Sequence, residues 1–180
     1  MKCRIKAKST SPMLMHKFIG MAESKEAKKK PLPDHAESFA YRDKDGNLAI
    51  PIMNMKACII DGFVQSAGSK QKTSTKMNVS SRIGIKSLGN DPMNLTLDVN
   101  EYEINRISVP SGGRTGGVRD WCVRPMIPEW SVEFVLVSNV DISEEDLKYK
   151  MIFAGTDVGI MSNRPNGYGR FEIVEFEEIQ

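Results

Sequence analysis

Residues 2–8 read Lys2-Cys3-Arg4-Ile5-Lys6-Ala7-Lys8, an unbroken alternation of cationic and apolar side chains. Successive side chains of a β-strand point to opposite faces, so the pattern predicts a half-buried strand with Cys3, Ile5 and Ala7 facing a core. The four cations then form a row on the other face, spaced by roughly 6.6 Å. This row has two interpretations. It is either a binding surface for a sugar–phosphate backbone or a solvated face whose charges prevent edge-to-edge aggregation.

The rest of the chain supplies elements that pack against such a strand. The alternation over Trp130–Val137 predicts a second strand. Pro51 precedes a helical apolar pattern that ends near Gly68. Ser143 is a candidate N-cap for a helix that runs to about Ala154, with Gly155 at its end. The remaining predicted elements are strands over Tyr102–Val109 and Arg170–Phe176 and a hairpin over Tyr41–Ile50 that turns at Asp45-Gly46.

These elements predict a single α+β domain. At 180 residues the chain has the length of one domain, which here comprises residues 1–180. Two helices on one face of an antiparallel sheet predict a modified ferredoxin-like fold. Residues 66–125 are assigned to a protruding insertion. The stretch Ser66–Asp91 is polar and basic, which predicts a long functional loop or insertion, and residues 111–117 are typical of a hairpin tip.

The cysteine pattern and the hydropathy exclude several protein classes. Cys3, Cys58 and Cys122 are widely spaced, which predicts neither a disulfide framework nor a zinc site. No metal and no cofactor is expected. The chain shows no secretory signal pattern and no apolar run long enough to span a membrane, so we expect a cytoplasmic protein without membrane contact.

Charge is distributed unevenly along the chain. Residues 1–30 contain nine Lys or Arg and two Glu, a net charge of +7, and because the whole chain carries +2, residues 31–180 carry 2 − 7 = −5. Residues 171–180 contain four Glu and no base. This segregation favours a polyanionic partner. It also suggests that the basic N-terminal segment of one copy meets the acidic tail of the next, in a head-to-tail filament or ring.

A glycine-rich segment over residues 159–170 precedes the last predicted strand. It carries Arg164, Tyr168 and Arg170 among its glycines. Glycines allow backbone amides to approach phosphates, and a tyrosine can stack on a base. A plain turn is an equally good interpretation of this composition.

Three motifs in the same order resemble the RAMP superfamily, the RNA-binding proteins of CRISPR systems. Gly159 followed by Gly167-Tyr168-Gly169 and Arg170-Phe171-Glu172-Ile173 resembles the superfamily's C-terminal glycine-rich loop. The opening strand that leads into Ser11-Pro12-Met13-Leu14-Met15-His16 is similar to its first strand and the step after it. Residues 42–51, running into Lys56-Ala57, resemble the hairpin and helix of the backbone subunits that line guide RNA.

The resemblance implies a modified ferredoxin-like core and side-by-side assembly along single-stranded nucleic acid. The sequence departs from the family pattern at Ile52 and Met161, where backbone subunits usually have glycine. Family members are also commonly longer. These departures favour a reduced or diverged relative, and they leave open a viral or mobile-element origin and a partner other than a CRISPR guide.

Arginines near a tryptophan form a second candidate contact region. Arginine pairs with phosphate in two-point fashion and stacks on bases, while Trp121 has an alternative interpretation as core or subunit-interface packing. The full set of candidate nucleic-acid-binding residues is Lys2, Arg4, Lys6, Lys8, His16, Lys56, Arg106, Arg114, Arg119, Trp121, Arg124, Arg164, Tyr168 and Arg170.

Catalysis has fewer candidates in this sequence. Some RAMP endonucleases use histidine as a general acid or base, which makes His16 a candidate for metal-independent RNA cleavage. Some backbone subunits cut RNA with an aspartate before the hairpin, where Asp34 lies and Glu37 is nearly as well placed. Both roles are implied by the resemblance.

The sequence therefore predicts a non-enzymatic protein that binds RNA, or less favourably single-stranded DNA, along its backbone with little sequence specificity. Its expected partners are nucleic acid, further copies of itself and CRISPR-type proteins. One alternative is a ribonuclease of the same fold. Another is a protein-interaction or anti-defence module that mimics a CRISPR backbone subunit and has lost nucleic-acid binding.

Overall fold

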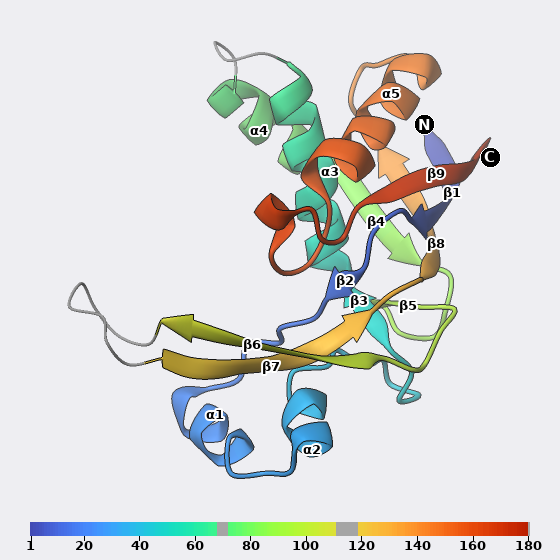
Figure 1. Cartoon of the computed structure of the whole chain (residues 1–180). Helices are drawn as coiled ribbons and strands as arrows, with labels where there is room; N and C mark the ends of the chain where they lie inside the picture. Colours follow the sequence, from blue (N-terminus) through green and yellow to red (C-terminus); the bar gives the residue numbers. More distant parts are fainter. Residues whose placement is uncertain (68–71, 111–118, 180) are drawn as a thin grey trace.

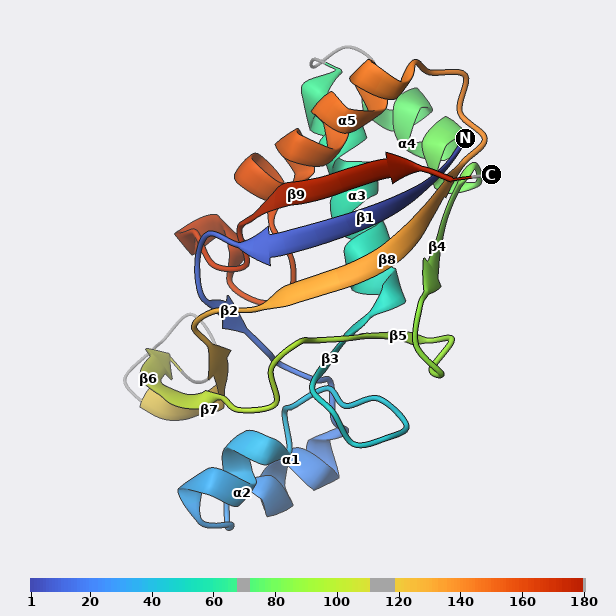
Figure 2. The same ribbon diagram turned by 90° about the vertical axis from the view of Figure 1, so that its right-hand side faces the viewer.

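The computed structural model describes residues 1–67, 72–110 and 119–179. Its centre is a four-stranded antiparallel sheet with the order β4 (Ile83–Ser87), β8 (Ser131–Ser138), β1 (Lys2–Ser9) and β9 (Phe171–Glu178). Figure 2 shows these strands side by side. The strands predicted at residues 2–8, 130–137 and 170–176 are confirmed within two residues of their ends.

Two long helices cover one face of this sheet. Helices α3 (Ile52–Ser66) and α5 (Glu144–Phe153) lie behind the strands in Figure 2. The apolar side chains of β1 are fully buried on that side, as the alternation predicts. Gly62 makes the close contact between α3 and the end of α5 possible, because a Cβ there would lie 2.7 Å from the Cβ of Ala154. The prediction of an α+β protein with an antiparallel sheet is confirmed.

Helix α5 begins and ends as predicted, and a π-helical turn follows it. The Ser143 side chain accepts a hydrogen bond of 3.1 Å from the backbone N–H of Asp146, which is an N-cap. The prediction that Gly155 caps the helix is wrong, because Gly155 lies inside a π-helical turn, η2 (Ala154–Val158), which ends at Gly159 with φ +73°. Gly155 is required for packing instead: a Cβ there would lie 2.1 Å from the carbonyl oxygen of Phe171.

A second sheet forms a projecting hairpin. Its order is β2 (Met13–Leu14), β7 (Arg119–Ile127) and β6 (Glu103–Pro110), and β6 and β7 extend sideways from the body in Figure 1. The short helices α1 (Met21–Ala27) and α2 (Leu32–Glu37) lie below this hairpin in the same view.

The segment predicted as a long loop contains regular structure. Helix α4 (Lys72–Ser80) is followed by β4, which pairs with β8 and buries Ile83. The prediction that Ser66–Asp91 is a loop is therefore wrong, since two apolar side chains, Ile83 and Ile85, suffice to add an edge strand to the sheet. The projecting part within residues 66–125 is the β6–β7 hairpin.

The turn at Asp45-Gly46 forms, with Gly46 at φ +86°, but its hairpin is reduced to a single bridge between Arg42 and Leu48. The N–H of Ala49 donates to the carbonyl oxygen of Tyr41 before the turn at 3.0 Å, and β3 (Ala49–Pro51) forms its ladder with β5 (Asn94–Thr96). Among the residues that the structure describes, no helix has the length and apolar character needed to cross a membrane.

Candidate nucleic-acid interface

The cationic row of β1, which consists of Lys2, Arg4, Lys6 and Lys8, lies on the open face of the main sheet. Carboxylates of the two neighbouring strands, β8 and β9, lie next to this row. Arg4 contacts Glu133 at 2.8 Å, and Lys6 contacts Glu133 at 3.2 Å and Glu175 at 3.5 Å. The register also places Glu177 opposite Arg4 and Glu172 opposite Lys8.

These neighbours make the β1 row close to neutral, with four cations facing four carboxylates. Arg4 and Lys6 hold the pKa of Glu133 below its ordinary value, so the carboxylate stays charged beside them. The acidic tail, which charge segregation assigned to a neighbouring copy, thus pairs with the basic strand of its own chain. This arrangement supports the interpretation of the β1 row as a solvated face.

A different cationic site lies at the foot of the hairpin. A cavity of about 280 Å³ is lined by five side chains, none of them acidic: His16, Tyr41, Asn54, Met161 and Ser162. We call it the hairpin-foot pocket. The lining residues come from segments that are distant in sequence: the chain after β2, the chain before β3, the first turn of α3 and the glycine-rich segment.

Arg124 of β7 joins this pocket to the hairpin. The side chain is only 7% exposed, and its guanidinium donates to the Ser162 hydroxyl at 3.1 Å and to the Asn105 side-chain oxygen at 3.4 Å. Both acceptors are neutral, so these contacts leave the positive charge of Arg124 uncompensated. A cation held in this way favours an anionic ligand.

His16 adds a titratable group next to this cation. Its ring stacks on Phe39, with ring centres 4.8 Å apart. Partial desolvation and the neighbouring charge of Arg124 lower the pKa of His16 below its ordinary value. The imidazole is therefore neutral at neutral pH and able to gain a proton when an anion approaches.

The N-terminus of α3 also opens onto the pocket. Pro51 stands at the N-cap position without a side-chain cap, and the first turn contains no acidic residue. Asn54 in that turn lines the pocket and donates to the sulfur of Met161 at 3.1 Å. The free N–H groups and the dipole of a helix N-terminus favour negative charge. Lys56, half-buried, follows two residues later on the same helix.

The sequence did not single out Tyr41 or Asn54. Both are neutral, and only the fold brings them beside His16. Ser162 lies inside the glycine-rich segment that was singled out, but a serine at this position does not by itself indicate a binding contact. The contact from Asn105 was missed for the same reason as Asn54.

The glycine-rich segment is a tightly held turn. Gly169, at φ +72°, has no room for a side chain, because a Cβ would lie 2.1 Å from the carbonyl oxygen of Ile160. Backbone hydrogen bonds fix the segment to the chain after β1, from Gly169 to Pro12 at 2.8 Å and from Ser162 to Leu14 at 3.1 Å. Met161 adopts φ +64°, a left-handed conformation that favours glycine, which is the residue expected at this position from the resemblance.

The arginines of this segment turn away from the hairpin-foot pocket. Arg164 contacts Asp61 of α3 at 3.5 Å, and Arg170 donates to the backbone oxygen of Arg164 at 3.2 Å. They border a separate cavity of about 220 Å³ that also includes two aspartates, Asp61 and Asp157. Tyr168 is half-buried in the same segment. The structure thus does not bring Arg164 and Arg170 together with His16.

The hairpin presents an aromatic side chain to solvent. Trp121 is 52% exposed, and the guanidinium of Arg106 lies 4.0 Å above its ring centre. This exposure excludes the interpretation of Trp121 as core packing. Arg119 is nearby and donates to Ser108 through its side chain at 2.8 Å. Arg114 lies outside the described residues.

Of the catalytic candidates, only His16 lines the pocket. Asp34 is exposed on α2. Glu37 is held by Arg42 through contacts of 2.5 and 2.9 Å and accepts a hydrogen bond of 2.8 Å from the Tyr102 hydroxyl. Burial and this carboxylate raise the pKa of Tyr102 to about 12. In the described part of the chain, no cluster of three potential metal ligands was found.

The chain is similar to a solved structure over nearly its whole length. The similarity is to a chain of the cryo-electron microscopy structure of the Type III-B Cmr-beta bound to cognate target RNA. The TM-score is 0.62 at 10% sequence identity, and the match covers 99% of this chain and 60% of that one. At this identity the similarity shows a shared fold. No protein-family model matches the sequence. No curated protein matches it either.

Proposed function

We propose that this protein binds single-stranded RNA at the hairpin-foot pocket and along the β6–β7 hairpin. The observation that carries the proposal is the charge of Arg124, which has only neutral acceptors and donates to Ser162 at the wall of a pocket that no carboxylate lines. His16 and the first turn of α3, which has no side-chain cap, border the same pocket. Two sources of positive potential, the Arg124 guanidinium and the N-terminus of α3, lie next to one cavity, and His16 can add a third by taking up a proton; a backbone phosphate is a ligand that all of them favour.

The fold supports this proposal. The main sheet has the order β4-β8-β1-β9, and its strands and helices follow one another as β1, α3, β4, β8, α5, β9. That sequence of elements is the one expected for a ferredoxin-like core. Together with the likeness to a chain of an RNA-bound Cmr structure, it favours a diverged RAMP-type subunit. This chain spans about 60% of that chain, and the assembly, the protein partners and the nucleic acid of the present protein are parts of the proposal.

In the proposed mode of binding, phosphates lie at the pocket while a base stacks on the hairpin. Arg124 and the N–H groups of α3 bind the backbone, which carries no sequence information. Trp121, held by Arg106, offers a flat surface on which any base can stack. We therefore expect little sequence specificity and copies arranged side by side along the strand.

Salt-dependent binding of a labelled oligonucleotide tests the proposal. For the nuclease-treated protein and a single-stranded RNA, we expect fluorescence anisotropy to show an affinity that falls by powers of ten between about 50 and 200 mM salt. No binding, or an affinity that does not change with salt concentration, would contradict the proposal and favour the protein-interaction module instead.

An Asn54→Asp variant provides a matched control for folding. A carboxylate in the first turn of α3 stabilises the helix by about 0.3–1 kcal/mol, yet it places a negative charge in the pocket. The variant should remain as thermostable as the wild type and lose RNA affinity, while Asn54→Ser keeps most of the affinity. Equal RNA affinity of the wild type and both variants would show that RNA does not bind at the pocket.

A second candidate function is RNA cleavage by His16, favoured by its neutral imidazole next to Arg124. In this reaction His16 accepts the proton of a ribose 2′-hydroxyl, whose oxygen attacks the adjacent phosphorus. The 5′-oxygen leaves and takes a proton from water, which yields a 2′,3′-cyclic phosphate. Incubation of labelled RNA with a chelator present tests it: cleavage by the wild type that is lost in His16→Gln would establish the activity, and intact RNA would exclude it.

A further inference from the structure

The separate cavity bordered by the arginines of the glycine-rich segment has the features of a binding site. Its volume is about 220 Å³, and its walls come from α3, the π-helical turn η2 and the glycine-rich segment. Drug-sized ligands occupy pockets of about 300–1,000 Å³, so this cavity fits a single base better than a whole nucleotide. We call it the two-arginine pocket, after Arg164 and Arg170.

The two arginines retain capacity to donate hydrogen bonds. Arg170 donates through Nη2 to the backbone oxygen of Arg164 at 3.2 Å, and its buried Nη1 has no acceptor among the described residues. Nη1 of Arg164 lies 3.5 Å from Oδ2 of Asp61, well beyond the roughly 2.7–2.9 Å of a close charge-assisted hydrogen bond. A ligand with acceptors can therefore bind Arg170 without breaking a tight ion pair.

Carboxylate acceptors line the same cavity. The side chain of Asp61 is 30% exposed, and its contact with Arg164 is made through Oδ2, which leaves Oδ1 able to accept from a ligand. Asp157 is exposed and already accepts a hydrogen bond of 2.5 Å from the hydroxyl of the preceding threonine. Val158 and Pro165 add apolar surface to the wall. Donors and acceptors beside apolar surface suit a flat ring with polar edges.

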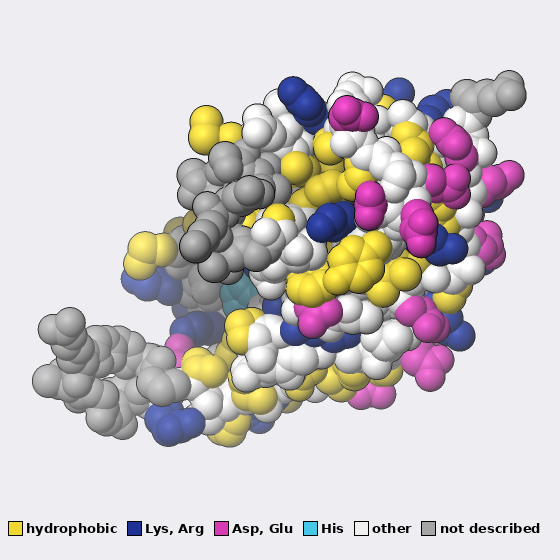
Figure 3. All heavy atoms as spheres, turned by 90° about the horizontal axis from the view of Figure 1, so that it is seen from above, with side chains coloured by type: hydrophobic (Ala, Val, Ile, Leu, Met, Phe, Trp, Pro, Cys, Tyr) yellow, Lys and Arg dark blue, Asp and Glu magenta, His cyan; other side chains and the backbone are white. Residues whose placement is uncertain are grey.

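Net charge does not select the ligand of this pocket. Asp61 lies in the second half of α3, which leads up to α4 in Figure 1. Figure 3, which looks down on that end of the molecule, shows Lys and Arg side chains among Asp and Glu side chains. The two-arginine pocket has the same mixture, with two arginines and two aspartates. Its ligand should therefore be recognised by the positions of its own donors and acceptors.

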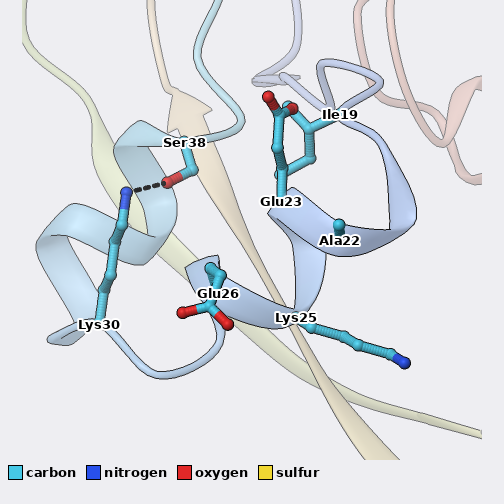
Figure 4. Close-up of a pocket in the computed structure, with 7 residues that line it drawn as sticks. All are labelled: Ile19, Ala22, Glu23, Lys25, Glu26, Lys30 and Ser38. Atoms are coloured by element: carbon cyan, nitrogen blue, oxygen red, sulfur yellow. Dashed lines mark hydrogen bonds between the residues drawn. The ribbon is translucent and has the colours of Figure 1, made fainter.

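A larger cavity beside α1, of about 550 Å³, lacks such free groups. The ammonium group of Lys30 lies 3.4 Å from the Ser38 hydroxyl, and Glu26 pairs with Lys29 at 2.6 Å. Figure 4 shows the side chain of Lys25 extending away from the other labelled side chains. The charged groups of that cavity thus have partners or point outward, and they do not define a ligand.

We propose that the two-arginine pocket binds a guanine base of the RNA. Guanine presents two acceptors, N7 and O6, on one edge and two donors, N1–H and the N2 amine, on the next. Arg170 pairs with N7 and O6, which is the commonest specific contact of arginine with a base. Asp61, beside Arg164, accepts from N1–H and the N2 amine. Adenine has an amine in place of O6 and an acceptor in place of N1–H, so it matches neither residue.

This inference rests on the proposed function and adds a base preference to it. The two pockets are neighbours along α3, because Asn54 of the hairpin-foot pocket and Asp61 are seven residues apart. Seven residues make two helical turns, so both side chains lie on one face of α3, about 10 Å apart. Ser162 and Arg164 are likewise close in the glycine-rich segment. A strand with a phosphate at the hairpin-foot pocket can therefore place a nearby base in the two-arginine pocket.

Oligonucleotides that differ in one base test the proposal. An oligouridine carries in its middle a single guanosine, adenosine, inosine or 7-deazaguanosine; inosine lacks the N2 amine of guanosine, and 7-deazaguanosine lacks the N7 acceptor. Fluorescence anisotropy should show that the wild-type protein binds the guanosine oligomer about tenfold more tightly than the adenosine oligomer. The inosine and 7-deazaguanosine oligomers should bind with intermediate affinity, because each retains part of the contacts.

Variants assign each edge of the base to one residue. Asp61→Ala should bind the guanosine and inosine oligomers equally, since the acceptor of the N2 amine is gone. Arg170→Met, which keeps the length of the side chain, should bind the guanosine and 7-deazaguanosine oligomers equally. The matched control Asp157→Ala removes the same charge as Asp61→Ala from the cavity and should keep the full preference for guanosine. Circular dichroism confirms that each variant is folded.

Equal affinity of the wild type for the guanosine and adenosine oligomers would overturn the inference, whatever the variants do. Discrimination against inosine that survives Asp61→Ala, or that is lost in Asp157→Ala, would overturn it as well. In these cases the proposed function stands if the oligomers bind with the expected dependence on salt. Failure of every oligomer to bind would instead contradict both the proposed function and the inference.

Discussion

The β1 row and the hairpin-foot pocket are both cationic, yet their surroundings differ. In the β1 row, cations alternate along one strand and face carboxylates from the strands on either side. At the wall of the pocket, the buried side chain of Arg124 has only neutral acceptors, one of which is the pocket residue Ser162. The row has more positive charges, but the pocket has more uncompensated charge. Affinity for a polyanion therefore depends on whether the fold places carboxylates next to the cations, and not on the number of cations in a segment.

The largest expected effect is the loss of RNA affinity when the charge of Arg124 is removed, compared with removal of charges from the β1 row. Arg124→Gln should weaken RNA binding by about tenfold to a hundredfold, since hydrogen bonds to charged groups contribute about 1.5–3 kcal/mol. The double variant Arg4→Gln/Lys6→Gln should change affinity less than about threefold, because those exposed cations already have carboxylate partners. Titrations monitored by anisotropy measure both. A larger loss in the β1 variant would reverse the assignment of the two regions.

The aromatic side chain of the hairpin should have the next largest effect. Trp121→Ala removes a stacking surface that contributes about 1–3 kcal/mol per base, so we expect about a tenfold loss of affinity. Trp121→Phe should restore most of it, which separates stacking from damage to the hairpin. Tryptophan fluorescence should also be quenched when RNA binds. If Trp121→Ala binds normally, the strand does not follow the hairpin.

The pocket should also respond to pH, and the β1 row should not. The pKa of free His16 is lowered, and a bound phosphate stabilises the imidazolium and raises that pKa. Binding then takes up a proton, so affinity should increase about threefold to tenfold as pH falls from about 7.5 to 5.5. His16→Gln should flatten this profile measured by anisotropy. An unchanged profile in the variant would show that the phosphate does not lie next to His16.

The smallest expected effect is a gain of affinity at the β1 row. Glu133→Gln/Glu175→Gln removes the carboxylates beside Arg4 and Lys6 and leaves those cations uncompensated. Binding of single-stranded RNA should become about twofold to threefold tighter and more sensitive to salt, with a change in stability below about 1 kcal/mol. The control Glu144→Gln/Glu145→Gln, which removes two exposed acids of α5 outside both regions, tests whether loss of any two carboxylates has the same effect. Equal changes in both variants would show a general effect of net charge.

The sequence predicts individual strands and helices of this fold better than it predicts which elements and side chains lie next to one another. Strict alternation in β1 and β8 is a local property of the chain, so both strands and the buried face were predicted correctly. Strand β4 was missed because two isoleucines in a polar stretch gain their significance only from pairing with β8. The neutralisation of the β1 row was missed because Glu133 and Glu175 lie more than a hundred residues away in sequence. The glycine-rich segment that the sequence singled out contains Ser162, which lines the hairpin-foot pocket, while Arg164 and Arg170 border a separate cavity with Asp61 and Asp157.

Crosslinking of RNA to the protein shows whether RNA lies at the hairpin-foot pocket and along the hairpin. A photoreactive single-stranded RNA is bound to the protein and irradiated, and the modified peptides are identified by mass spectrometry. We expect crosslinks in residues 13–18, 119–127 and 159–163, around His16, Trp121 and Ser162. Crosslinks concentrated instead in residues 2–9 and 131–138 would place the RNA on the open sheet face, and the proposed site would be wrong.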